Sequence, residues 1–268
     1  MDRGVPVDGH VHGEFSWDAR RGSLEGTCRR AIELGMPGIV FTEHADFVTA
    51  FPDQHRLDLV AYAEEVERCR TRFPGLRILL GVELGEAHWF PAEARELLSA
   101  APIERVLGSV HCAGSRDAPR DASQTMPVCP DPVEQLQAQL LETLALVQSG
   151  AEFDVLAHLD YPKRYWPAGA PPFDETALEE EYRAVLRATA RRGAVLEVNS
   201  TRGMEPIRGL CPGPVALRWW LEEGGEAVVF GSDAHSPEAL ALGFDHARQA
   251  VEAAGFRPGK DPLDHWRR

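Results

Sequence analysis

The sequence predicts an α/β protein built as one closed barrel. Seven short apolar segments, rich in Val, Ile, Leu and Phe, recur along the 268 residues with little polar alternation. This pattern is typical of parallel strands that are buried on both faces. Helical or polar segments separate the strands and no linker interrupts the series, so residues 1–268 are expected to form a single domain. A doubly wound open sheet is the alternative topology.

The seven predicted strands are three to six residues long, within the length range of strands in α/β proteins. Each precedes a polar or glycine-containing turn, where a strand would end. They are residues 5–7, 38–41, 78–82, 105–110, 154–157, 194–198 and 227–230.

Two segments between these strands carry clear helical periodicity. Apolar residues spaced by three and four mark one face in residues 57–73 and again in residues 174–192. Longer loops, at residues 113–130 and 162–173, are rich in Pro, Gly or charge, which is common in functional loops. The expected helix boundaries are the N-caps Ser23, Asp131 and Asp174, the first-turn Pro132, and the terminal Gly75 and Gly193.

The composition excludes several classes of function. A formal net charge of -14 argues against a nucleic-acid-binding protein, which would need a basic face. The five cysteines are scattered and form no CxxC pair, as expected in a reducing cytoplasm. The first four residues carry no apolar leader, and no apolar stretch is long enough to span a membrane. A cytoplasmic protein without nucleic-acid or membrane partners is therefore expected.

Histidine and acidic side chains gather where the predicted strands end. In parallel α/β barrels these positions converge on one face, where chemistry is usually found. Six of the ten histidines lie there. In chain order the polar residues are His10 and His12, Glu43 and His44, Glu83, His111, His158 and Asp160, Asn199, and Asp233 and His235.

Any one of these residues has a structural explanation; Asp233, for example, could cap the following helix. Six imidazoles converging with several carboxylates would repel or compete unless a cation lay among them. His and carboxylate donors without Cys favour Zn, Mn or Fe(II). The donors exceed what one ion can bind, so two or three divalent ions are expected, with Glu83 able to bridge a pair. Such a site favours hydrolysis, since a hydroxide held between metals can attack a phosphoester.

The residues lie in seven segments that together resemble the polymerase-and-histidinol-phosphatase (PHP) family of phosphoesterases. The amino-acid sequences of the fourth, fifth and sixth segments are most similar to those of the histidinol-phosphate phosphatase branch. The segments are "DGHVH" (8–12), "TEHAD" (42–46), "GVELGE" (81–86), "GSVHC" (108–112), "AHLDYPKRY" (157–165), "LEVNSTRG" (196–203) and "GSDAHSP" (231–237).

This resemblance implies a distorted (β/α)7 barrel with three metal positions. Asp18 stands where many relatives have histidine, so the ligands of the third position depart most from the family pattern. The implied ligands are His10, His12, Glu83 and Asp233 for the first metal, Glu83, His111 and His158 for the second, and Asp18, His44 and His235 for the third.

The resemblance also implies a phosphomonoesterase, with L-histidinol phosphate as its small-molecule substrate. Asp233 or His235 would protonate the leaving group, and Asp8 would orient a ligand histidine. Basic side chains after strands five and six can grip phosphate, Arg164 foremost because of the family pattern. The substrate-binding candidates are Lys163, Arg164, Arg202 and Asn199, and the catalytic ones are Asp233, His235 and Arg164.

Three other functions fit parts of the pattern. A PHP phosphoesterase could act on a nucleotide or a cyclic phosphodiester instead. An amidohydrolase barrel also begins with HxH, but it often bridges its metals through a lysine after strand four, where this chain has His111. A non-catalytic metal-binding barrel would have lost several ligands, whereas nearly the whole set is present here.

Overall fold

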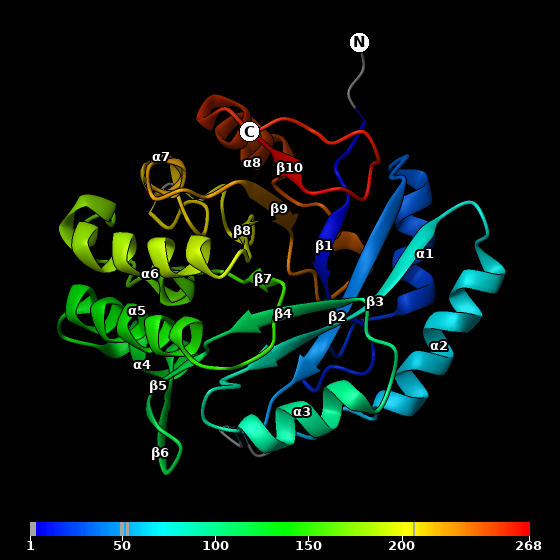
Figure 1. The fold of residues 1–268 in the computed structure, drawn as a ribbon, viewed down its shortest axis with the longest axis horizontal. Helices are drawn as coiled ribbons and strands as arrows, with labels where there is room; N and C mark the ends of the chain where they lie inside the picture. The colour runs from blue at the N-terminus through cyan, green and yellow to red at the C-terminus, as the bar shows by residue number, and fades with distance from the viewer. Residues whose placement is uncertain (1–3, 49–50, 52–53, 206) are drawn as a thin grey trace.

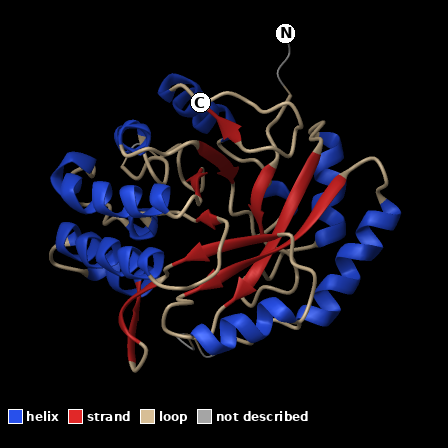
Figure 2. Ribbon diagram, in the orientation of Figure 1, coloured by secondary structure: helices blue, strands red, loops and turns tan. Residues whose placement is uncertain are grey.

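The computed structural model describes residues 4–48, 51, 54–205 and 207–268, and it is an α/β barrel as predicted. Strands occupy the centre and helices lie around their outside (Figure 2). Seven strands are parallel and stand in chain order around the sheet, so each lies beside its predecessor. They are β1 (Asp8–Val11), β2 (Gly38–Ala45), β3 (Arg77–Gly85), β4 (Arg105–Ser109), β7 (Val155–Leu156), β8 (Val195–Asn199) and β9 (Ala227–Gly231).

The barrel closes between β1 and β9, which rules out the doubly wound alternative. Val11 pairs in parallel with Ala234, and the Asp233 amide donates to the His10 carbonyl at 2.8 Å. At the opposite end β9 pairs instead with the short antiparallel β10 (Trp266–Arg267). β1 and β9 therefore pair only at their carboxyl ends, and in this respect the barrel is distorted.

The first strand lies three residues later than the predicted segment at 5–7. The Asp8 carboxylate is fully buried and accepts hydrogen bonds from the backbone amides of Ser232 and Ala241, at 2.9 and 3.1 Å. These contacts fix residues 8–11 against the end of β9. The Asp8 carboxylate also accepts from the backbone amide of His10 at 3.3 Å, and its role in orienting a ligand histidine stays a prediction.

Helices cover the outside of the barrel, and α1 contacts α2 while α5, α6, α7 and α8 contact one another in sequence (Figure 1). A hairpin of β5 (Cys112–Ser115) and β6 (Ala118–Asp121) projects from the barrel between β4 and α5 (Figure 1). The helices are α1 (Leu24–Glu33), α2 (Leu59–Arg72), α3 (Pro91–Ser99), α4 (Ala122–Thr125), α5 (Pro132–Gln148), α6 (Glu179–Arg191), α7 (Pro214–Glu222) and α8 (Phe244–Ala254). Short 3-10 turns are η1 (Met126–Val128), η2 (Tyr161–Tyr165), η3 (Glu175–Leu178) and η4 (Pro237–Ala239).

The predicted helix signals are largely confirmed. Side chains of Ser23, Asp131 and Asp174 accept hydrogen bonds from amides of the following turn. Gly193 ends α6 in a left-handed conformation (φ 75°). The predicted helix at 174–192 begins as the 3-10 turn η3 and becomes α-helical only at Glu179.

No helix in the described part of the chain is long and apolar enough to cross a membrane. The expected absence of an apolar leader concerns residues 1–4, of which only Gly4 lies within the described ranges.

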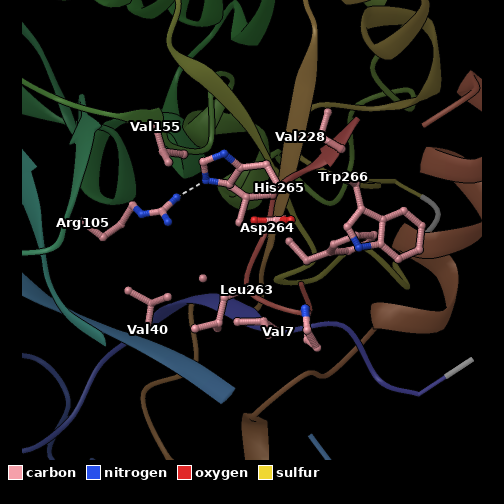
Figure 3. Close-up of a pocket in the computed structure, with 13 residues that line it drawn as sticks. Val7, Val40, Arg105, Val155, Val228, Leu263, Asp264, His265 and Trp266 are labelled. Carbon is pink, nitrogen blue, oxygen red and sulfur yellow. Dashed lines mark hydrogen bonds between the residues drawn. The ribbon is translucent and has the colours of Figure 1, made fainter. Parts of the chain in front are cut away.

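The C-terminal segment fills the amino end of the barrel. Leu263, His265 and Trp266 border a cavity of about 20 Å³ that is also lined by strand residues such as Val40 and Val155 (Figure 3). The Arg105 guanidinium points into this end of the barrel and donates to His265 Nε2. Burial, with the nearby charges of Arg105 and Arg267, lowers the pKa of His265 to about 4.

His265 therefore makes stability depend on pH. An unfolded histidine titrates near pH 6.5, so the stabilisation is complete above about pH 6.5 and is lost as the pH falls toward 4. We expect metal-free wild-type protein to lose about 2 kcal/mol more unfolding free energy between pH 7 and 4.5 than His265→Gln, after allowance for partial exposure. Urea denaturation at both pH values measures this, and equal losses in the two proteins would contradict it.

Candidate metal centre

The carboxyl ends of the strands bring all nine predicted metal ligands into one cluster. His10 and His12 are two residues apart around β1, so their side chains point to the same side, into the barrel. Glu83 lies within β3 and is fully buried. The others are His44 on β2, Asp18 on the loop after β1, and His111, His158, Asp233 and His235 after β4, β7 and β9.

Glu83 lies at the centre of the cluster, and its two carboxylate oxygens face different histidines. Oε2 lies 3.2 Å from His10 Nε2 and 3.4 Å from His12 Nε2. Oε1 lies 3.0 Å from His111 Nε2 and 2.6 Å from His158 Nε2. One carboxylate thus separates two groups of donors, as a bridging ligand would.

The distances in the first group fit metal coordination. Bonds of about 2.0–2.1 Å to a tetrahedral zinc place neighbouring donor atoms about 3.3 Å apart. His10 Nε2 and His12 Nε2 are 3.0 Å apart, and Asp233 Oδ1 lies 3.7 and 3.2 Å from them. Glu83 Oε2, which is buried and has no well-formed hydrogen bond, completes the group. These residues fit a divalent cation.

The third predicted set is also brought together. Asp18 Oδ2 lies 3.1 Å from His235 Nε2, and Asp18 Oδ1 lies 3.5 Å from His44 Nε2. His235 and Asp18 are each about one-third exposed, so this set lies at the rim of the cluster. The carboxylate of Asp18 therefore occupies a position from which it can serve in place of a histidine.

Electrostatics favour the ligand forms of Glu83 and His12, whereas nearby carboxylates outweigh burial and raise the pKa of His10, His44 and His111. Burial disfavours ionised Glu83, but the charges of His10, His44 and His111 outweigh it and hold the pKa of this carboxyl well below its usual range. Burial, reinforced by His44 and His235, lowers the pKa of His12 to about 3. Ionised carboxylates and neutral imidazoles are the forms that bind metal ions.

Asp233 joins the cluster to the predicted phosphate-binding side chains. Its Oδ2 forms an ion pair with Arg164 and lies 3.4 Å from Asn199 Nδ2, while Oδ1 faces the histidines. Asp233 has a φ of 52°, a left-handed conformation that costs a non-glycine residue about 1 kcal/mol or more. The strained residue is therefore the one whose side chain contacts both the histidines and the predicted phosphate-binding residues.

The structure separates the three predicted basic residues. Arg164 is nearly buried beside Asp233. Arg202 donates to the Arg164 carbonyl at 3.0 Å and lies over the Tyr165 ring, so it supports η2 from outside. Lys163 does not reach the cluster; its Nζ is buried against Asp160 at 2.7 Å.

Sequence reasoning missed the carboxylate that holds His10. Glu197 Oε1 lies 2.7 Å from His10 Nδ1, and its Oε2 accepts from the His158 backbone amide at 2.6 Å. A glutamate inside the apolar strand β8, on the same face as Asn199, was the available signal. Elsewhere Ser16 Oγ lies 3.0 Å from His12 Nδ1 and donates to buried Glu43.

Replacing Glu197 should weaken metal binding without removing a ligand. In Glu197→Gln only one oxygen remains to serve the His10 ring and the His158 amide, so we expect the half-saturating Mn²⁺ concentration to rise about 10- to 100-fold. Titration of apoprotein with Mn²⁺ measures this, with exposed Glu180→Gln on α6 as the matched control. Half-saturation at the wild-type concentration would show that Glu197 does not orient the ligands.

A cleft with a volume of about 90 Å³ opens beside His44 and His111. Aromatic side chains, among them Trp17 and Tyr161, line it together with the acids Asp46, Glu86 and Asp121. The lining residues that the structure describes include no Lys or Arg. A small organic group that is neutral or cationic suits such a cleft.

Comparisons with known proteins agree with this geometry. The PHP domain family profile matches residues 8–201. A histidinol-phosphatase of Lactococcus lactis is 28% identical over 252 residues, covering 93% of this chain and 91% of that protein. A Clostridium acetobutylicum protein named "Probable histidinol-phosphatase" is 27% identical and covers 94% of each chain.

A solved structure extends the agreement to three dimensions. The histidinol phosphate phosphatase of Lactococcus lactis, in complex with zinc, L-histidinol and phosphate, superposes with a TM-score of 0.84. It is 27% identical to this chain and the match covers 95% of both chains. From the family profile, the barrel and the clustered residues together, this chain belongs to the PHP domain family.

Proposed function

We propose that the protein is a metal-dependent phosphatase that hydrolyses L-histidinol phosphate to L-histidinol and phosphate, a reaction of histidine biosynthesis. Its relatives are named for this activity, and a structure similar along the whole chain holds zinc, L-histidinol and phosphate. We further propose that residues 1–268 act as one domain, which is supported by a hydrophobic core that extends from Val11 to Trp266.

The observation that carries the proposal is the arrangement around Glu83. Its two oxygens face two separate groups of histidines, at donor separations that suit divalent cations. We propose that His10, His12, Glu83 and Asp233 hold one cation and that Glu83, His111 and His158 hold a second. Asp18, His44 and His235 would hold a third. Zinc, manganese or iron(II) suits these donors.

Divalent cations bound there would act as Lewis acids on the phosphoryl oxygens and on the attacking water. The Arg164 guanidinium lies beside Asp233 and offers paired donors to phosphoryl oxygens. Asn199 holds the Oδ2 side of Asp233. The leaving alkoxide would take a proton from His235 at the rim of the cluster, or from Asp233 after that carboxylate has taken the proton released by the attacking water. Asp233 has no proton of its own to give, because the effect of burial is outweighed by the adjacent Arg164, which holds the pKa of this carboxyl well below its usual range.

The cleft beside the cluster supports this substrate over nucleotides. Histidinol carries an ammonium group and an imidazole, and the cleft offers the acids Asp46, Glu86 and Asp121 between aromatic rings. A nucleotide that carries further phosphates would meet these acids without a compensating cation among the described lining residues.

A phosphate-release screen tests the function. Apoprotein is loaded with Zn²⁺, Mn²⁺ or Fe²⁺ and assayed against metabolite monoesters, nucleotides and cyclic phosphodiesters, histidinol phosphate included. We expect the highest kcat/KM with histidinol phosphate. Hydrolysis of nucleotides without hydrolysis of histidinol phosphate would refute the proposed substrate but not the proposed phosphoesterase chemistry. If no phosphoester were hydrolysed with any of the metals, the proposal that the protein is a phosphatase would be wrong.

A further inference from the structure

Lys163 lies in a buried polar network that it forms with Asp160, Tyr182 and Glu175. Its Nζ is 2.7 Å from Asp160 Oδ2, an oxygen that also accepts from the Tyr182 hydroxyl at 2.7 Å. Nζ is also 3.7 Å from Glu175 Oε1. The Lys163 side chain is only 4% exposed, and the side chain of Asp160 is fully buried.

This network joins η2 to three other elements. Tyr182 belongs to α6, and Glu175 lies in η3. The Glu175 carboxylate accepts from the amides of Gly213 and Ala216, at 2.7 and 3.1 Å, and so holds the first turn of α7. The ammonium of Lys163 therefore compensates two buried carboxylates at the junction of four segments.

The next residue points to the opposite side. Arg164 extends from η2 toward Asp233, forms an ion pair with it, and lies over the Tyr161 ring. The Lys163 amide donates to the Asp160 carbonyl at 3.0 Å, so the same short turn carries both the anchored lysine and the arginine that faces Asp233. Movement of this turn would displace the guanidinium.

We propose that Lys163 is a positioning residue: its buried ion pair with Asp160 fixes η2 so that Arg164 reaches the phosphoryl group. Lys163 itself touches neither the substrate nor the metal ligands. This proposal rests on the proposed phosphatase function only in assigning phosphate to Arg164. It differs from the sequence-based expectation, in which Lys163 binds the substrate directly.

The test uses inorganic phosphate as the probe of the Arg164 position. Calorimetry measures phosphate binding to the zinc-loaded wild type, Lys163→Met, Arg164→Met and the double variant, and metal content is measured for each. We expect Lys163→Met to weaken phosphate binding about 10- to 100-fold, the value of one or two charge-assisted contacts, with metal content unchanged. The double variant should bind phosphate no more weakly than Arg164→Met alone, since both changes remove the same contact.

Other results would overturn the proposal. Phosphate affinity unchanged in Lys163→Met, or effects of the two substitutions that multiply, would show that Lys163 does not act through Arg164. If Lys163→Met fails to fold because Asp160 is left buried and unpaired, Lys163→Met/Asp160→Asn decides by the same criteria. The amide oxygen that this second change introduces can still accept from Tyr182. Because the probe is inorganic phosphate, the result of this test can be interpreted even if histidinol phosphate proves not to be the substrate.

Discussion

Glu83→Gln should nearly abolish phosphatase activity. Each Glu83 oxygen faces its own group of histidines. An amide in its place leaves Asp233 as the anionic donor of the first group and leaves His111 and His158 without one. Cations in such sites contribute several kcal/mol to the stabilisation of transition-state charge, so we expect kcat/KM to fall about 10³-fold or more. Steady-state kinetics at saturating Mn²⁺, together with metal analysis of the purified variant, measure both effects.

The control for Glu83→Gln is Glu67→Gln, the same substitution on the exposed face of α2. This variant should retain wild-type activity and metal content. If Glu83→Gln bound its full complement of metal and kept its rate within a few fold, the carboxylate would not be a shared ligand. The assignment of the cluster as a bridged metal centre would then be wrong.

Arg164→Met should lower kcat/KM about 10²- to 10³-fold, the cost of losing one charged donor to developing negative charge. Methionine retains apolar contact with Tyr161 but offers no donor to the phosphoryl oxygens. Metal content should stay at the wild-type value because Arg164 binds no metal. Initial rates at several substrate concentrations, with inhibition by inorganic phosphate, measure the loss.

Arg164→Lys is the matched variant, since it keeps the charge and loses the planar pair of donors. We expect its activity to fall between those of the wild type and Arg164→Met. A wild-type rate in Arg164→Met would mean that phosphate is held by the metals alone, whereas equal loss in both variants would assign the effect to the paired geometry.

The sequence predicted the barrel because local patterns are sufficient for it. Short apolar runs without alternation indicate strands buried on both faces, and the order of strand and helix leads to a parallel arrangement. The first strand was misplaced because Asp8 is charged. Only contacts with Ser232 and Ala241, more than two hundred residues away, make its burial favourable.

The convergence of the metal-ligand candidates was likewise predictable, since it follows from strand ends that meet on one face. The partners of those candidates were not predictable. A glutamate inside an apolar strand marks Glu197 as unusual, but nothing local to "LEVNS" identifies His10, 187 residues away in sequence, as its partner. The same holds for Ser16, which joins His12 to Glu43.

The adjacent residues Lys163 and Arg164 show what the sequence predicts and what only the tertiary structure decides. Both are basic, both follow strand β7, and the sequence assigns both to the substrate. The tertiary structure turns Lys163 toward Asp160 and Glu175 and turns Arg164 toward Asp233. The sequence by itself determined which strand ends carry the chemistry, because that depends on local periodicity. The direction of each side chain was decided by the fold, because a buried charge must find its counter-charge among residues that only the folded chain brings near.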